Sequence, residues 1–101
     1  MIEVTILSRH DCHLCDVALR IAQHVQTEMP FTLTRMNIDE QADLAARYGD
    51  RVPVILIDQV EALSGKMTEG EFRRAISNKK ARERGPISRI LSRLRQWLRR
   101  G

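Results

Sequence analysis

The two cysteines of this 101-residue chain, Cys12 and Cys15, lie between a predicted strand and a predicted helix. The strand is the apolar run at residues 1–7, which is rich in β-branched side chains. The helix is indicated by apolar residues that recur at three- and four-residue spacing, namely Leu14, Val17, Ala18, Ile21, Ala22 and Val25. Backbone amides at a helix start stabilise a thiolate. The placement of the cysteines therefore predicts a redox-active pair.

The compartment expected for this chain argues against a structural disulfide. No stretch of the sequence approaches the ~20 apolar residues that span a bilayer. The first residues lack the basic start and the long apolar region of a secretory signal. We therefore expect a cytoplasmic location, where thiols are kept reduced and a disulfide rarely serves as a permanent crosslink.

The segments after the cysteines predict a βαβ unit and a second helix. The first helix is expected over residues 14–27, because Pro30 cannot continue it. Residues 31–38 alternate between apolar and polar side chains, as a half-buried strand does. A strand, a helix and a second strand in this order imply a parallel pair with a right-handed connection. Asp39 is expected to cap the next helix, over residues 40–48.

The remaining segments predict a hairpin and a closing helix. Residues 52–57 are apolar enough for a central strand, and residues 60–63 are expected to return antiparallel after a tight turn. Thr68 and Glu71 form a capping-box pattern, which marks the start of the last helix of the domain. The predicted order is β-α-β-α-β-β-α, an α/β fold.

Two motifs in this order resemble the thioredoxin superfamily, and more closely the small glutaredoxin-like proteins. They are SRHDCHLC at residues 8–15 and RVPV at residues 51–54. The resemblance covers about residues 1–78, and it implies a thioredoxin-like fold for them. Residues 79–101 are expected to add a basic linker and a basic amphipathic C-terminal helix.

The resemblance implies thiol–disulfide exchange on protein or low-molecular-weight disulfides. Cys12 would attack as a thiolate, and Cys15, one turn further along, would resolve the mixed disulfide. The resemblance also implies that the bond before Pro53 is cis and that this proline faces the cysteines. The backbone of Val52 would then pair with an extended substrate.

Several flanking residues could support this chemistry. Arg9 stands where glutaredoxins often carry a basic residue, so it either contacts the thiolate or the substrate, or is a solvated loop cation. Gly65, with the amides near Thr68, is expected to be able to receive a carboxylate. Asp11 and Asp16 are expected to be a helix cap and a solvated first-turn residue.

No tightly bound cofactor or metal ion is expected. Glutathione is a candidate reductant, but the chain lacks the Gly-Gly turn that glutaredoxins tend to carry. Zinc is disfavoured because its four candidate ligands crowd into six residues without a second ligand pair, namely His10, Cys12, His13 and Cys15. An iron–sulfur cluster shared across a dimer is disfavoured because the sequence lacks the ligand pattern of such a cluster.

The last part of the chain differs from the rest in charge. Residues 1–78 carry eight Lys and Arg against twelve Asp and Glu, whereas residues 79–101 carry nine against one. After a charged linker at residues 79–85, Pro86 begins a predicted helix with an apolar stripe formed by Ile87, Ile90, Leu91, Leu94, Trp97 and Leu98.

This basic amphipathic segment has three interpretations. Residues 86–101 could dock on the acidic domain, bind a membrane surface, or bind a protein partner. Nucleic acid is disfavoured because the domain is acidic and the tail holds a single aromatic residue. The segment also supports a competing function, in which the domain is a redox-inactive adaptor that docks through its tail.

Overall fold

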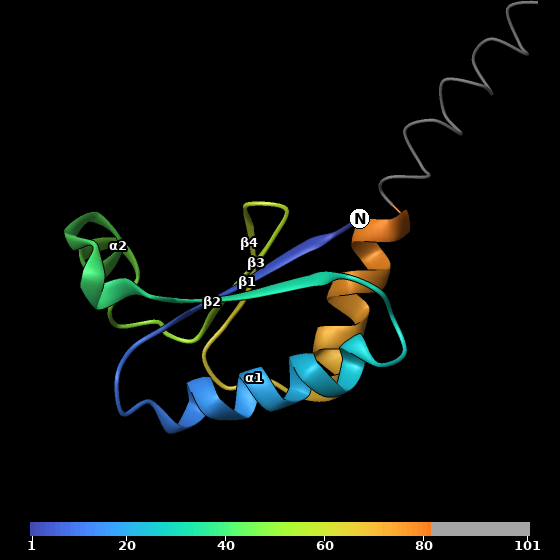
Figure 1. The fold of residues 1–101 in the computed structure, drawn as a ribbon, viewed down its shortest axis with the longest axis horizontal. Helices are drawn as coiled ribbons and strands as arrows, with labels where there is room; N and C mark the ends of the chain where they lie inside the picture. The colour runs from blue at the N-terminus through green and yellow to red at the C-terminus, as the bar shows by residue number, and fades with distance from the viewer. Residues whose placement is uncertain (82–101) are drawn as a thin grey trace, which may run out of the picture.

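The computed structural model describes residues 1–81, which form a four-stranded sheet with helices on both faces (Figure 1). The strands lie in the order β2-β1-β3-β4. β2 is parallel to β1, whereas β3 is antiparallel to β1 and β4 is antiparallel to β3. The strands are β1 (Glu3–Ser8), β2 (Thr32–Asn37), β3 (Val54–Ile57) and β4 (Val60–Ser64). The parallel first pair and the antiparallel hairpin confirm the predicted pairing.

The helices follow the predicted order. They are α1 (His13–Gln26), the 3₁₀ turn η1 (Ile38–Glu40), α2 (Ala42–Tyr48) and a closing helix at residues 69–81. α1 and the closing helix cover one face of the sheet, and α2 lies at one end of the other (Figure 1). Most predicted boundaries lie within two residues of those observed. The predicted tail helix at residues 86–101 lies outside the described residues.

The larger core lies between the sheet, α1 and the closing helix. Alternate residues of β1 point into it, because successive side chains of a strand face opposite sides of the sheet. The rings of Phe31 and Phe72 meet there, with centroids 5.9 Å apart and planes inclined by 48°. The fully buried members are Ile6, Ala18, Ala22, Val25, Ile55, Phe72 and Ile76. This core packs α1 against the sheet, and it thereby fixes the position of the cysteines at the start of α1.

A smaller core on the opposite face holds α2 against the sheet. It consists of Leu7 on β1, Ile38 in η1, Tyr48 at the end of α2, and Val54 at the start of β3. Leu7 and Val54 face each other in the β1–β3 register. The cluster therefore anchors α2 at the edge of the sheet where the cysteine loop begins.

The predicted cap at Asp39 is wrong. The side-chain oxygen of Asn37 accepts a hydrogen bond from the Asp39 amide at 2.9 Å, and this caps the start of η1. α2 begins only at Ala42, and Gln41 before it makes no side-chain capping bond. The Asp39 carboxylate is instead paired with Arg9. An Asn side chain readily binds the amide two residues further along the chain, and the turn that this bond caps precedes the start of α2.

The hairpin between β3 and β4 confirms the predicted tight turn and shows its type. Asp58 and Gln59 have φ angles of 49° and 72°, and a two-residue turn with both φ positive is type I′. Asp tolerates this conformation without a glycine. The Asp58 carboxylate also accepts a hydrogen bond from the Glu3 amide at 2.9 Å and pairs with Lys79 at 3.4 Å. These contacts tie the turn to β1 and to the closing helix.

The closing helix begins as its capping box predicts. The Thr68 hydroxyl accepts a hydrogen bond from the Glu71 amide at 3.1 Å. The helix continues through residues 79–81, which the sequence assigned to a linker. Those positions include two lysines, which are good helix formers, and the first Gly-Pro break comes later, at residues 85–86.

An ion pair joins the closing helix to the turn that follows α1. The Arg73 guanidinium lies 2.7 Å from the Glu28 carboxylate. The hydrogen bond and the charge of Arg73 hold the pKa of Glu28 below its ordinary value. The same bond to Glu28 raises the pKa of Arg73.

No helix within residues 1–81 is both long and apolar enough to cross a membrane.

Candidate functional site

The two cysteines lie at the first turn of α1 and differ sharply in exposure. Cys12 is the N-cap residue, with an extended backbone, and its sulfur accepts a hydrogen bond from the Cys15 amide at 3.2 Å. Cys12 is partly exposed, whereas Cys15 is completely buried. The two are joined in a disulfide with Cα atoms 5.2 Å apart. Of the pair, Cys12 is therefore the residue that solvent reaches.

The loop that delivers Cys12 turns at Asp11. Asp11 has a φ of 54°, a left-handed conformation that Asp adopts more readily than most residues. The prediction that Asp11 caps the helix is wrong, because the sulfur of Cys12 takes that place. The Asp11 carboxylate instead lies 3.5 Å from the ring of His10, and both side chains are almost fully exposed.

Asp16 lies in the first turn of α1 with its side chain 60% exposed, as predicted, and it is also bound to another element. Its carboxylate lies 3.3 Å from the guanidinium of Arg35 on β2. Arg35 also donates a hydrogen bond to the hydroxyl of Ser8 on β1 at 3.1 Å. We call these three residues the Ser8–Arg35–Asp16 bridge. It links both parallel strands to the turn that carries the cysteines.

Sequence reasoning missed Ser8 and Arg35 as parts of the site. A signal was present, because alternation along residues 31–38 places Arg35 on the same side of the strand as Phe31 and Leu33. That side packs on the helix. A cation on the apolar face of a strand needs a partner, and Asp16 in the facing helix provides one.

Pro53 lies at the same edge of the sheet as the cysteine loop. The Val52–Pro53 peptide bond is cis, which confirms the prediction. Val54 pairs with Leu7 in the register, so Pro53 lies beside the end of β1, from which the chain runs to Cys12. The Pro53 side chain is buried, and Val52 is half-buried against the smaller core.

Gly65 is held next to Pro53 by the backbone. The Gly65 amide donates a hydrogen bond to the Pro53 carbonyl at 2.8 Å. Gly65 has a φ of 72°, a conformation that glycine adopts at no steric cost. The fold thus brings together the cis-proline and the glycine that the sequence analysis singled out. Their roles toward a substrate stay predictions.

Arg9 has two protein partners. Its guanidinium lies 2.9 Å from the Asp39 carboxylate and donates a hydrogen bond to the Gly49 carbonyl at 3.4 Å. These contacts tie the cysteine loop to η1 and to the end of α2. Because the side chain is still 43% exposed, it keeps a solvent-facing surface beside the loop. Its predicted contact with a thiolate or substrate stays a prediction.

A pocket of about 400 Å³ opens next to the loop that leads to Cys12. It is lined by residues 8–10, by residues 35–37 at the end of β2, and by Glu40. Three side chains that can carry positive charge border it, namely Arg9, His10 and Arg35.

In the described part of the chain, no group of three or more His, Cys, Asp and Glu residues is placed to hold a metal ion.

Comparison with known proteins identifies the family to which the described domain is similar. Residues 3–77 match the family model of the glutaredoxin-like domain (DUF836). No curated protein matches the chain.

Solved structures with the same fold come from several organisms. Protein XcR50 from X. campestris is 28% identical, has a TM-score of 0.64, and aligns over 74% of this chain and 96% of its own. Protein Ne2328 from Nitrosomonas europaea is 25% identical, with a TM-score of 0.64, over 72% of this chain and 88% of its own. A mutant thioredoxin from Halobacterium salinarum is 18% identical, with a TM-score of 0.61, over 76% of this chain and 73% of its own. The described residues thus have a thioredoxin-like fold.

Proposed function

The chain belongs to the glutaredoxin-like domain family, and on this premise we propose that it is a thiol–disulfide oxidoreductase. The observation that carries the proposal is the contrast between the two sulfurs. One lies partly exposed at the N-cap of α1 and accepts a helix amide, and the other is buried one turn further on. An attacking and a resolving thiol need this arrangement.

The proposed reaction consumes two thiols and one disulfide. The Cys12 thiolate attacks one sulfur of the substrate disulfide, forms a mixed disulfide, and releases the other sulfur as a thiolate. Cys15, after losing its proton, attacks the Cys12 sulfur and releases the second substrate thiolate. Two electrons pass from the cysteine pair to the substrate, and its two thiolates take up the protons. The Cys12–Cys15 disulfide is the oxidised product, which an external thiol reductant must reduce.

The N-cap position supports Cys12 as the attacking group. The Cys15 amide that reaches the Cys12 sulfur would hydrogen-bond to a thiolate there, and bonds to the charged form favour it. The dipole of α1, a helix of 14 residues, acts in the same direction. We therefore expect the pKa of the Cys12 thiol to lie below the value of about 8.5 for free cysteine.

Substrate binding is proposed at the sheet edge beside Pro53. The backbone of Val52 would pair with an extended segment around the substrate sulfur. Gly65, held next to Pro53, offers space where a Cβ atom would meet nothing within 4 Å. The exposed part of Arg9 could meet an acidic substrate. Protein disulfides and small disulfides both fit this proposal, with glutathione as one candidate reductant.

The test is to trap the mixed disulfide. Reduced Cys15→Ser protein, mixed with hydroxyethyl disulfide, is expected to gain one hydroxyethylthio group on Cys12, because nothing remains to resolve it. The reduced wild-type protein should instead form its internal disulfide and release both halves of the probe as thiols. Intact-mass measurement and peptide mapping distinguish the two products.

Two results would contradict the proposal. One is a Cys15→Ser protein that takes up no adduct under conditions where a free cysteine does. The other is a wild-type protein whose adduct persists although Cys15 is reduced. A second probe, a protein disulfide such as that of insulin, shows whether larger substrates are also accepted.

A further inference from the structure

We infer that Arg35 is a positioning residue for the redox pair, which acts by neutralising Asp16, a carboxylate one helical turn beyond Cys12. The inference deepens the proposed function and rests on it for the role of Cys12. Arg35 need not touch the substrate to act in this way. Its effect would come through the charge that the attacking sulfur experiences.

Asp16 is placed where it opposes a thiolate at Cys12. It is four residues further along the chain, and its amide donates a hydrogen bond to the Cys12 carbonyl at 3.2 Å. This bond is the first of the helical pattern, and it holds Asp16 one turn above Cys12. Since like charges at such a distance disfavour each other, an uncompensated carboxylate here would make Cys12 harder to ionise.

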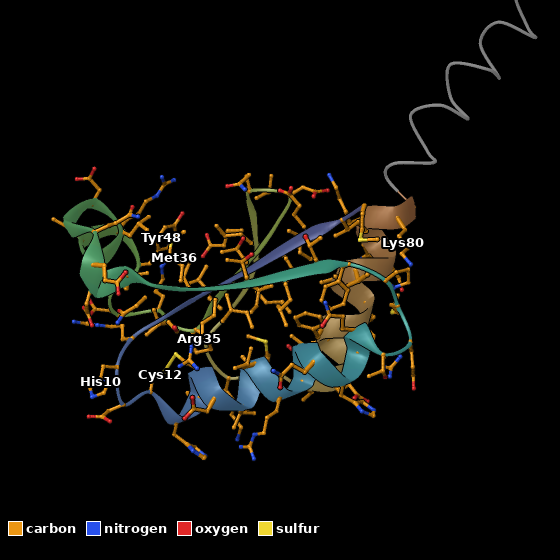
Figure 2. All side chains as sticks on the ribbon, viewed as in Figure 1. His10, Cys12, Arg35, Met36, Tyr48 and Lys80 are labelled. Carbon is orange, nitrogen blue, oxygen red and sulfur yellow. A yellow bond between two sulfur atoms is a disulfide. The ribbon has the colours of Figure 1, made fainter. Side chains whose placement is uncertain are left out.

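Arg35 is fixed in place to cancel that charge. Figure 2 shows it on β2, facing the start of α1, where Cys12 lies. One part of its guanidinium group lies 3.3 Å from Asp16, and another donates to the Ser8 hydroxyl at 3.1 Å. Ser8 is only 2% exposed and in turn donates to the Met36 carbonyl at 3.4 Å. A buried hydroxyl needs partners, so Ser8 anchors the arginine to the sheet.

The other charged groups near Cys12 are engaged differently. His10 and Asp11 lie 3.5 Å apart in the exposed loop, and Arg9 is paired with Asp39. His13 follows Cys12 at the first position of α1. Within residues 1–81, Arg35 is the charged group from another element that is bound to this turn of the helix. This makes the Ser8–Arg35–Asp16 bridge the contact most able to shift the ionisation of Cys12.

A charge cycle in the Cys15→Ser background tests the inference. The measured quantity is the pH dependence of Cys12 alkylation by iodoacetamide. Arg35→Gln should raise the pKa of the Cys12 thiol, and Asp16→Asn should lower it. Both side chains are about half exposed, so we expect changes of about three- to tenfold in the thiolate fraction rather than larger ones.

Two further variants separate charge from shape. Arg35→Lys keeps the charge and should retain most of the parent behaviour. The double variant Arg35→Gln with Asp16→Asn should return close to the parent pKa, because no net charge is removed. A merely structural role for Arg35 would instead lower the urea midpoint of unfolding and leave the alkylation profile unchanged.

The outcomes are decisive in either direction. The inference is overturned if Arg35→Gln folds and its alkylation profile matches the parent, or if Asp16→Asn leaves the profile unchanged. If Arg35→Gln does not fold, Asp16→Asn and Arg35→Lys decide alone. Because alkylation needs no disulfide substrate, the inference can hold even where the trapping experiment fails, and the two failures are distinguishable.

Discussion

Replacing Cys12 with serine is expected to reduce disulfide-exchange turnover by at least ~10³-fold, the scale on which loss of a reacting group is felt. A serine hydroxyl stays protonated at neutral pH, so no nucleophile remains at the exposed N-cap. Cys15 cannot take over because its side chain is completely buried. The measurement is the reduction of hydroxyethyl disulfide by the purified protein, with dithiothreitol as the recycling reductant.

Leu14→Ala is the matched control for this prediction. Leu14 lies between the two cysteines and is 39% exposed, so its replacement perturbs the same turn without removing a thiol. Alanine is a strong helix former, and the variant should keep most of the turnover. Appreciable turnover in Cys12→Ser would show that another group attacks the substrate.

Replacing Phe72 with alanine should cost about 3–5 kcal/mol of the free energy of unfolding, the usual range for a buried aromatic residue. Phe72 is completely buried in the larger core and stacks at an angle on Phe31. Native domains are stable by only about 5–15 kcal/mol. A large share of the molecules would therefore unfold on mild heating or in low urea. The loss would also remove one of the contacts that hold the closing helix against the larger core, to which Ile76 of the same helix belongs as well.

Urea unfolding of the reduced proteins measures this cost. Val60→Ala is the control, because Val60 is also apolar and yet 61% exposed at the end of the hairpin. Its cost should stay below about 1 kcal/mol, in line with other surface changes. Equal midpoints for Phe72→Ala and the wild type would mean that the ring does not pack as described.

The order of the helices and strands could be predicted because each of them is marked by a local sequence pattern. Three-to-four spacing marked α1, alternation marked β2, and Thr68 with Glu71 marked the start of the closing helix. The errors came at the starts of the first two helices. Cys12 took the capping place that the sequence analysis gave to Asp11. The second helix begins two residues later than predicted, after a 3₁₀ turn that Asn37 caps, so Asp39 is not at its start.

The candidate site was predictable only in part. The cysteine pair and the cis bond before Pro53 were found from motifs. The partners of Asp16 and Arg9 were not, because each lies in another element, about 20 or more residues away along the chain. Local patterns carry no information about which surfaces the fold brings together. Arg35 was recoverable in principle, as a cation on the buried face of a strand.

The most direct test of the central claim is alkylation of the reduced wild-type protein across pH, with peptide mapping of the label. We predict that Cys12 is labelled first, with a pKa below the value of about 8.5 for free cysteine. Cys15, buried behind it, should react far more slowly. If both thiols titrate like free cysteine and react at equal rates, or if Cys15 is labelled first, the proposed division between attacking and resolving thiol is contradicted.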